Sequence, residues 1–94
     1  MRVGLLRAKV YLHGCRSLKE KRQRLAKLRD KFGKQTGMAV CESDLADDLR
    51  QGEWSFVAVA GSGDVVQQSL AEVERYLTST IDAEVVGLER EWLV

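Results

Sequence analysis

The sequence predicts an α+β fold of four strands and two helices in the order β-α-β-β-α-β. Stretches of alternating or continuous apolar residues, typical of strands, lie at both ends and in the middle of the chain. Two stretches with apolar residues three or four positions apart, typical of amphipathic helices, separate them. The chain has 94 residues, which is the length of one domain, and we expect a single domain over residues 1–94.

Residues 2–12 predict the first strand, because apolar side chains alternate along them. We expect one face to be buried and the other to be mixed. The predicted buried face consists of Leu6, Ala8, Val10 and Leu12, and the mixed face of Leu5, Arg7, Lys9 and Tyr11.

The first helix is predicted to begin after Ser17, because Ser17 and Glu20 form a capping box. It continues for about 15 residues, and Gly33 and Gly37 offer places to stop. Lys21 falls within its apolar stripe, so we expect its stem to cover the edge of the core and its ammonium to reach water.

Residues 38–43 and 54–60 predict the second and third strands, and the latter is apolar on both faces, as in a central strand. Between them, residues 44–53 predict an acidic loop. Residues 65–79 predict the second helix, and residues 83–94 the last strand. Cys41 alternates with Ala39, and we expect it to fill the core.

This element order specifies a ferredoxin-like split βαβ, with one four-stranded antiparallel sheet and both helices on one face. Right-handed crossovers place the first strand between the third and the last. Arg7 and Lys9 would then share the helix-free face with Glu89 and Glu91, as cross-strand charge pairs. The helix residues predicted to be buried are Leu18, Leu25, Leu28, Phe32, Leu70, Val73 and Leu77.

Charge is divided unevenly along the chain, although the net charge is only +1. Residues 1–34 contain twelve Lys and Arg residues and two acidic residues. The remaining residues contain three Lys and Arg residues and twelve acidic residues. Such a basic segment indicates a surface for a polyanion, or two halves that neutralise each other on folding. The predicted nucleic-acid-binding residues are Arg16, Lys19, Arg22, Arg24, Lys27, Arg29, Lys31 and Lys34.

No pattern of catalytic or ligand residues points to an enzyme, a metal or a cofactor. The loop from His13 to Arg16 leads into a helix and could bind an anion, as in acylphosphatases. Those enzymes need an asparagine to position water, and this chain contains none. Cys15 lies near basic residues, where a thiolate is favoured, but His13 is the only histidine. We therefore expect no catalytic activity, no metal and no cofactor.

The N-terminal residues lack the apolar core of a signal peptide, and no stretch is long enough to span a bilayer. Two cysteines 26 positions apart are too few for a disulfide scaffold. We therefore expect a cytoplasmic protein that does not bind membranes.

Several segments of the sequence together form a recognisable pattern. They are the strand that starts at Met1–Leu6, followed by Arg16–Arg22, Val40–Glu42 with Asp44, Asp48–Gln51, Phe56–Ala60 and Ala83–Val86. In these segments the chain resembles the YlxP-like family of small bacterial proteins of unknown function, and it departs from the family's pattern at Cys15 and at Gly52–Trp54. The resemblance implies a ferredoxin-like fold and a bacterial cytoplasmic protein whose gene often lies among those for translation initiation and ribosome maturation factors.

Two functions follow as expectations. The first is an RNA- or ribosome-binding accessory factor that uses the basic first helix, as the charge and the resemblance imply. The alternative is a homo-oligomeric interaction module, or a regulatory module for a small ligand, without nucleic-acid binding. Its support is the helix-free sheet face, on which we expect exposed apolar residues and a homodimer interface. The residues predicted to form it are Leu5, Tyr11, Val85 and Leu93.

Overall fold

The chain folds as the sequence predicts, with four strands and two helices in the order β-α-β-β-α-β. The computed structural model describes all 94 residues. The four strands form one antiparallel sheet in the order β2-β3-β1-β4, which is the ferredoxin-like arrangement. The elements are β1 Arg2–Tyr11, α1 Leu18–Phe32, β2 Met38–Asp44, β3 Gln51–Ala60, α2 Gly63–Ser79 and β4 Glu84–Trp92.

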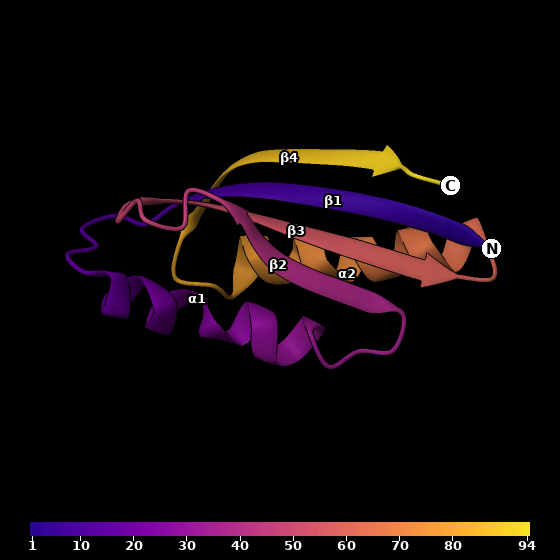
Figure 1. Cartoon of the computed structure of the whole chain (residues 1–94), viewed down its shortest axis with the longest axis horizontal. Coiled ribbons are helices and arrows are strands. Elements are labelled where there is room, and N and C mark those ends of the chain that lie inside the picture. Colours follow the sequence, from indigo (N-terminus) through magenta and orange to yellow (C-terminus); the bar gives the residue numbers. More distant parts are fainter.

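Both helices lie on one face of the sheet, and the other face carries no helix (Figure 1). α2 packs against the central strands β1 and β3, while α1 lies against the edge strand β2. β1 and β3 pair over ten residues each, from Arg2 opposite Ala60 to Tyr11 opposite Gln51. β3 therefore begins three residues earlier than its apolar run predicts, because pairing with β1 orders the polar Gln51–Glu53 segment.

The core lies between the sheet and the helices, and six of the seven predicted helix residues are buried in it. The seventh, Leu18, is only half-buried, because it is the first residue of α1. The predicted buried face of β1 is confirmed from Leu6 to Leu12. Opposite it on β3, Trp54, Phe56 and Ala58 complete the floor of the core.

The capping interaction at the start of α1 is confirmed in part. The Ser17 hydroxyl accepts a hydrogen bond from the Glu20 amide at 3.0 Å. The Glu20 carboxylate does not return to Ser17 and instead pairs with Arg24 one turn further on. In α2, the Ser62 hydroxyl accepts from the Val65 amide in the same way.

Cys41 is exposed, so the prediction that it fills the core is wrong. It lies opposite Ser55, on the helix-free face of β2, whereas the neighbouring Val40 faces the core. Alternation alone does not tell which face of an edge strand is buried, because both faces of this strand carry small or apolar residues.

Val85 lies on the helix side, so its predicted place on the helix-free face is also wrong. The pairing of β4 with β1 shifts by one residue between Lys9 and Val10, which places Val85 opposite Val10. A bulge of this kind turns the side chains beyond it to the other face.

Of the predicted cross-strand charge pairs, one forms. Arg7 lies opposite Glu89, and its guanidinium approaches the carboxylate to 3.0 Å. Across the β1–β4 pairing, Lys9 lies opposite Gly87 and Glu91 lies opposite Leu5, so the second predicted pair does not form. Lys9 instead lies opposite Glu53 of β3. Neither helix of the protein has the length and hydropathy needed to cross a membrane.

Candidate nucleic-acid interface

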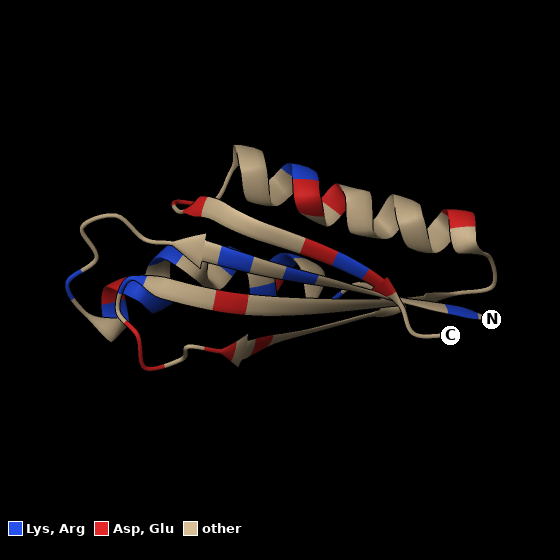
Figure 2. Cartoon of the chain, turned by 90° about the horizontal axis from the view of Figure 1, so that it is seen from above, with Lys and Arg blue, Asp and Glu red and all other residues tan.

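The outward surface of α1 and its flanks carries most of the free positive charge of the protein. Figure 2 shows basic segments along α1 and β1, and acidic segments mainly on the other strands, the loops and α2. Seven of the eight predicted cations are exposed and have no carboxylate within 4.0 Å. They are Arg16, Lys19, Arg22, Lys27, Arg29, Lys31 and Lys34, which we call the basic face.

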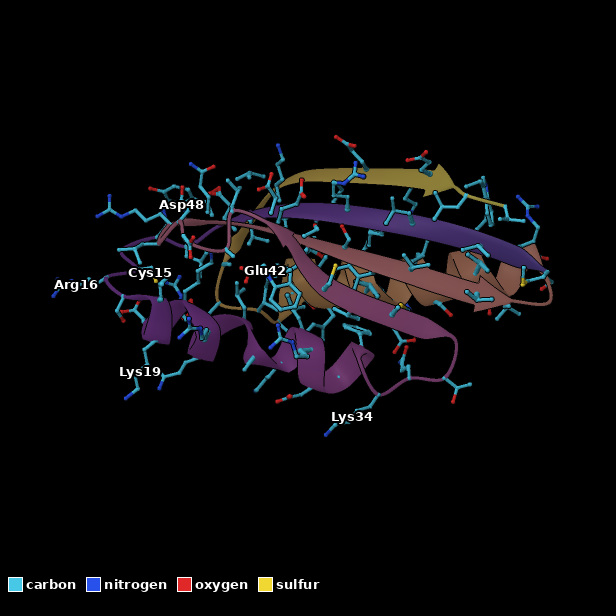
Figure 3. All side chains as sticks on the ribbon, viewed as in Figure 1. Cys15, Arg16, Lys19, Lys34, Glu42 and Asp48 are labelled. Carbon is cyan, nitrogen blue, oxygen red and sulfur yellow. The ribbon has the colours of Figure 1, made fainter.

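The basic face runs from one end of the helix to the other. In Figure 3, Arg16 and Lys19 extend into solvent near the start of α1, and Lys34 does so beyond its end. The fifteen residues of the helix rise over about 22 Å. The buried stripe that includes Leu25 and Leu28 turns the rest of the helix surface outward, so the amphipathicity of α1 exposes the five cations of the basic face that lie within it.

Two members of the basic face rest on aromatic rings at the rim of the core. The Arg29 guanidinium lies 5.5 Å from the ring of Trp54. The Lys31 ammonium lies 5.6 Å from both Phe32 and Tyr76. Such cation–π contacts restrict the side chains while the charged groups remain in water. Asp30 is the one acid of α1 that shares this exposed surface.

Arg24, the eighth predicted cation, is tied into the fold. Its guanidinium donates to the carbonyl oxygen of Asp82 at 2.8 Å and to that of His13 at 2.9 Å. It also pairs with the Asp82 carboxylate at 3.2 Å and with Glu20 at 3.3 Å. With 13% of its side chain exposed, Arg24 joins α1 to two loops and is not available to phosphates.

Lys21 differs most from expectation, because its ammonium does not reach water. The side chain is 3% exposed, and its Nζ donates to the carbonyl oxygens of Leu45, Asp48 and Gln51 at 2.7, 2.7 and 2.8 Å. The carboxylate of Glu42 lies 3.3 Å away. An ammonium has three N–H donors, so the three carbonyls use them fully. Lys21 therefore anchors the segment between β2 and β3 to α1.

The acidic segment between β2 and β3 is shaped by its own carboxylates. Asp48 Oδ1 accepts from the amides of Arg50 and Gln51, and Asp44 Oδ1 accepts from the amide of Leu45. Leu45 has a φ of 60°, in the left-handed region. No group of three or more Asp, Glu, His or Cys is placed to hold a metal ion.

A groove of about 280 Å³ separates α1 from this segment and from β2. Arg22 and Arg29 line one side of it and Asp47 the other, and Trp54 forms part of its floor. The indole N–H of Trp54 is buried and has no hydrogen-bond partner. Sequence reasoning missed this groove, because it depends on how the loop passes α1.

The loop before α1 holds the two residues considered for reactivity. Cys15 is fully buried, and its thiol donates to the carbonyl oxygen of Ser17 at 3.4 Å. His13 is exposed, with Nε2 at 2.9 Å from the Glu84 carboxylate and its ring against Tyr11. Burial removes Cys15 from the surface that a reactive thiol requires.

Comparison with known proteins agrees with the fold. The chain superposes on a de novo designed protein, Ferredog-Diesel, with a TM-score of 0.52 and 16% sequence identity, over 95% of this chain and 83% of that one. No curated protein matches the sequence. A family model described as a protein of unknown function, DUF503, matches residues 3–90. This match covers almost the whole sequence, and the chain therefore belongs to the DUF503 family.

Proposed function

We propose that this protein binds RNA through the basic face of α1, as an accessory factor of the ribosome. One observation supports the proposal most: seven exposed cations without acidic partners lie within residues 16–34. On the sheet, by contrast, basic residues stand near acids, as Arg7 does near Glu89. The two halves of the charge distribution therefore do not fully neutralise each other on folding.

Binding by such a surface is electrostatic. Exposed Lys and Arg contact phosphate oxygens, and the released counterions make the affinity fall as salt rises. Phosphate contacts position a protein without reading bases, so we expect little sequence preference. If the basic face neutralises about four phosphates, the log–log slope of affinity against salt is roughly −3 for a single strand.

The test compares two triple reversals that change the net charge equally. The first, Lys27→Glu with Lys31→Glu and Lys34→Glu, alters the basic face. The control, Lys9→Glu with Arg50→Glu and Arg75→Glu, alters exposed cations on β1, the β2–β3 loop and α2. None of the six side chains forms an ion pair, so both proteins should fold.

Fluorescence anisotropy with a labelled single-stranded RNA, and co-sedimentation with ribosomes, measure the outcome. We expect the reversal on α1 to abolish binding at low salt and the control to reduce it by no more than about threefold, because only long-range attraction changes. Equal loss in both proteins, or no RNA binding by the wild type, would refute the proposal.

The helix-free face supports the alternative of self-association. Its end near the chain termini is apolar, with Val59 and Leu93 both more than 40% exposed beside Val3, Leu5 and Val57. Sedimentation equilibrium would show a dimer that dissociates on substitution of Val59→Lys. A single species of 10.6 kDa at high micromolar concentration would exclude this alternative.

A further inference from the structure

The edge strand β4 is the less protected of the two edges of the sheet. The opposite edge, β2, ends in Glu42, Ser43 and Asp44 and has α1 beside it. Large apolar residues remain exposed along β4 and next to it, whereas natural edge strands are normally shielded by charge or by a covering element. They are Val86 at 60%, Leu88 at 39%, Trp92 at 42%, Leu93 at 48% and Val94 at 61% exposed.

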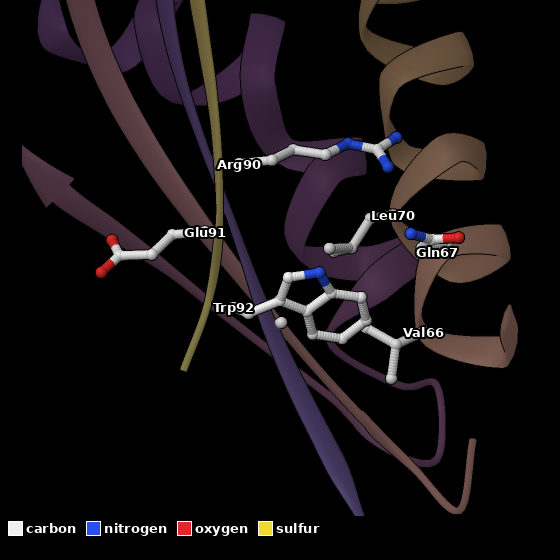
Figure 4. Close-up of a pocket in the computed structure, with 7 residues that line it drawn as sticks. Val66, Gln67, Leu70, Arg90, Glu91 and Trp92 are labelled. Atoms are coloured by element: carbon white, nitrogen blue, oxygen red, sulfur yellow. The ribbon is translucent and has the colours of Figure 1, made fainter. Parts of the chain in front are cut away.

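A cleft of about 190 Å³ opens between β4 and the first half of α2, because α2 packs mainly against β1 and β3. Val66 and Leu70 from α2 face the ring of Trp92 across it, as Figure 4 shows. Gly4 of β1 also lines the cleft. The side chains of β4 that point toward the helices therefore border an open apolar space.

The walls of this cleft are held in place. The ring of Trp92 lies 4.0 Å from the guanidinium of Arg2, and Arg2 Nε donates to the carbonyl oxygen of Val94 at 3.0 Å. Next to the indole, Gly4 presents no side chain. Further along, Arg90 reaches α2 and pairs with Glu74 at 2.6 Å, as its direction in Figure 4 indicates. The cleft is thus largely formed before any partner binds.

The other face of β4 is acidic. Glu89 and Glu91 lie on the helix-free side, and Figure 4 shows Glu91 pointing away from the cleft. Arg7 pairs with Glu89, but Glu91 has no cation near it. A strand laid beside β4 would therefore meet Leu88, Trp92 and the Arg90 side chain held by Glu74 on one face, and carboxylates on the other.

We propose that β4 and its cleft bind an extended segment of another protein, in which apolar residues alternate with Lys or Arg, as a fifth strand. Backbone pairing with the edge supplies affinity, and the cleft selects an apolar side chain. A second copy fits less well, since antiparallel pairing of β4 with itself brings its glutamates near one another. This inference is independent of RNA binding by α1.

The probe is a synthetic peptide that matches the nine residues of β4 in length, with lysine alternating with leucine or valine. Its control is the same peptide with every second backbone amide N-methylated, which keeps charge and side chains but removes donors for strand pairing. In ¹⁵N-resolved titrations of the full chain, we expect the first peptide to shift amides of β4 and the first half of α2. The methylated peptide should bind at least about tenfold more weakly, because backbone pairing is lost.

Two variants test the charge requirement. Glu91→Lys should weaken peptide binding about fivefold, since one favourable contact becomes a repulsive one. Asp47→Lys makes the same change in charge on the β2–β3 loop and should leave binding unchanged. Equal binding of both peptides, shifts confined to α1, or a dimer whose β4 amides are already protected would overturn the proposal.

Discussion

The ammonium of Lys21 and the carboxylate of Glu42 lie 3.3 Å apart beneath the segment that connects β2 to β3. The same ammonium donates to three carbonyl oxygens of that segment and its ends. One side chain of α1 thus satisfies backbone acceptors that would otherwise need water. Because Lys21 is 3% exposed, removing it would leave these acceptors and a partly buried carboxylate without their donor.

Replacing Lys21 should therefore destabilise the fold strongly. We expect Lys21→Met, which keeps most of the stem, to lower the free energy of unfolding by about 3 kcal/mol, because one partner of a buried charge pair is lost. Urea unfolding followed by circular dichroism measures this change. Lys27→Met on the exposed side of α1 is the matched control and should change stability by less than about 0.5 kcal/mol.

The contribution of Glu42 can be separated by a double-mutant cycle with Glu42→Gln. If the ion pair matters beyond the carbonyl contacts, the two substitutions together should cost less than the sum of their separate effects. Additive effects would show that the carbonyl oxygens alone account for the role of Lys21.

The sequence predicts the place of Lys21 on α1 but not its burial. Helical periodicity correctly placed it within the apolar stripe of α1, together with Leu25 and Leu28. Its partners Leu45, Asp48 and Gln51 lie 24, 27 and 30 positions away. The path of that loop is not encoded in a local pattern, so the sequence predicted a lysine reaching water rather than a buried one.

The fold itself was predictable because each element carries a local signal. Alternation marked β1, and Ser17 marked the start of α1. The errors at Cys41 and Val85 arose where pairing, rather than periodicity, decides the face. For the candidate site, the helical periodicity predicted that the cations of α1 point outward. It did not predict that Arg24 donates a hydrogen bond to the carbonyl oxygen of Asp82.

Arg24 should act as a structural residue rather than as part of the RNA surface. We expect Arg24→Ala to lower the free energy of unfolding by about 2 kcal/mol, because the carbonyl oxygens of His13 and Asp82 lose a charged donor. Arg24→Lys should recover less than half of this, since one ammonium cannot replace the planar fork. Chemical unfolding tests both, and RNA affinity measured on the folded fraction should be unchanged. A loss of RNA binding without a loss of stability would contradict this assignment.

Gly4 should not tolerate a side chain. A Cβ at this position would lie 2.7 Å from Val66 Cγ1 and 3.2 Å from Leu70 Cδ1. We expect Gly4→Ala to cost about 1–3 kcal/mol through overpacking. In the matched control, Gly61→Ala, nothing lies within 4 Å of the added carbon, and stability should hardly change. Combining Gly4→Ala with Val66→Ala should restore part of the loss, because the second change makes room for the first. Thermal unfolding of the four proteins would show whether the clash is real.

The two cysteines should differ widely in their reaction with a thiol reagent. Cys41 is exposed on β2, whereas Cys15 is fully buried and can react only when the structure around it opens. We expect one thiol per chain to react at once and the second at least about 5,000-fold more slowly, because an opening free energy near the global stability is about 5 kcal/mol or more. Cys41→Ser should abolish the fast reaction, and Cys15→Ala should leave it intact. In denaturant, Cys15 and Cys41 should react with the reagent at similar rates. If Cys15 reacted quickly in the native protein, the loop before α1 would open far more often than its burial in the core implies.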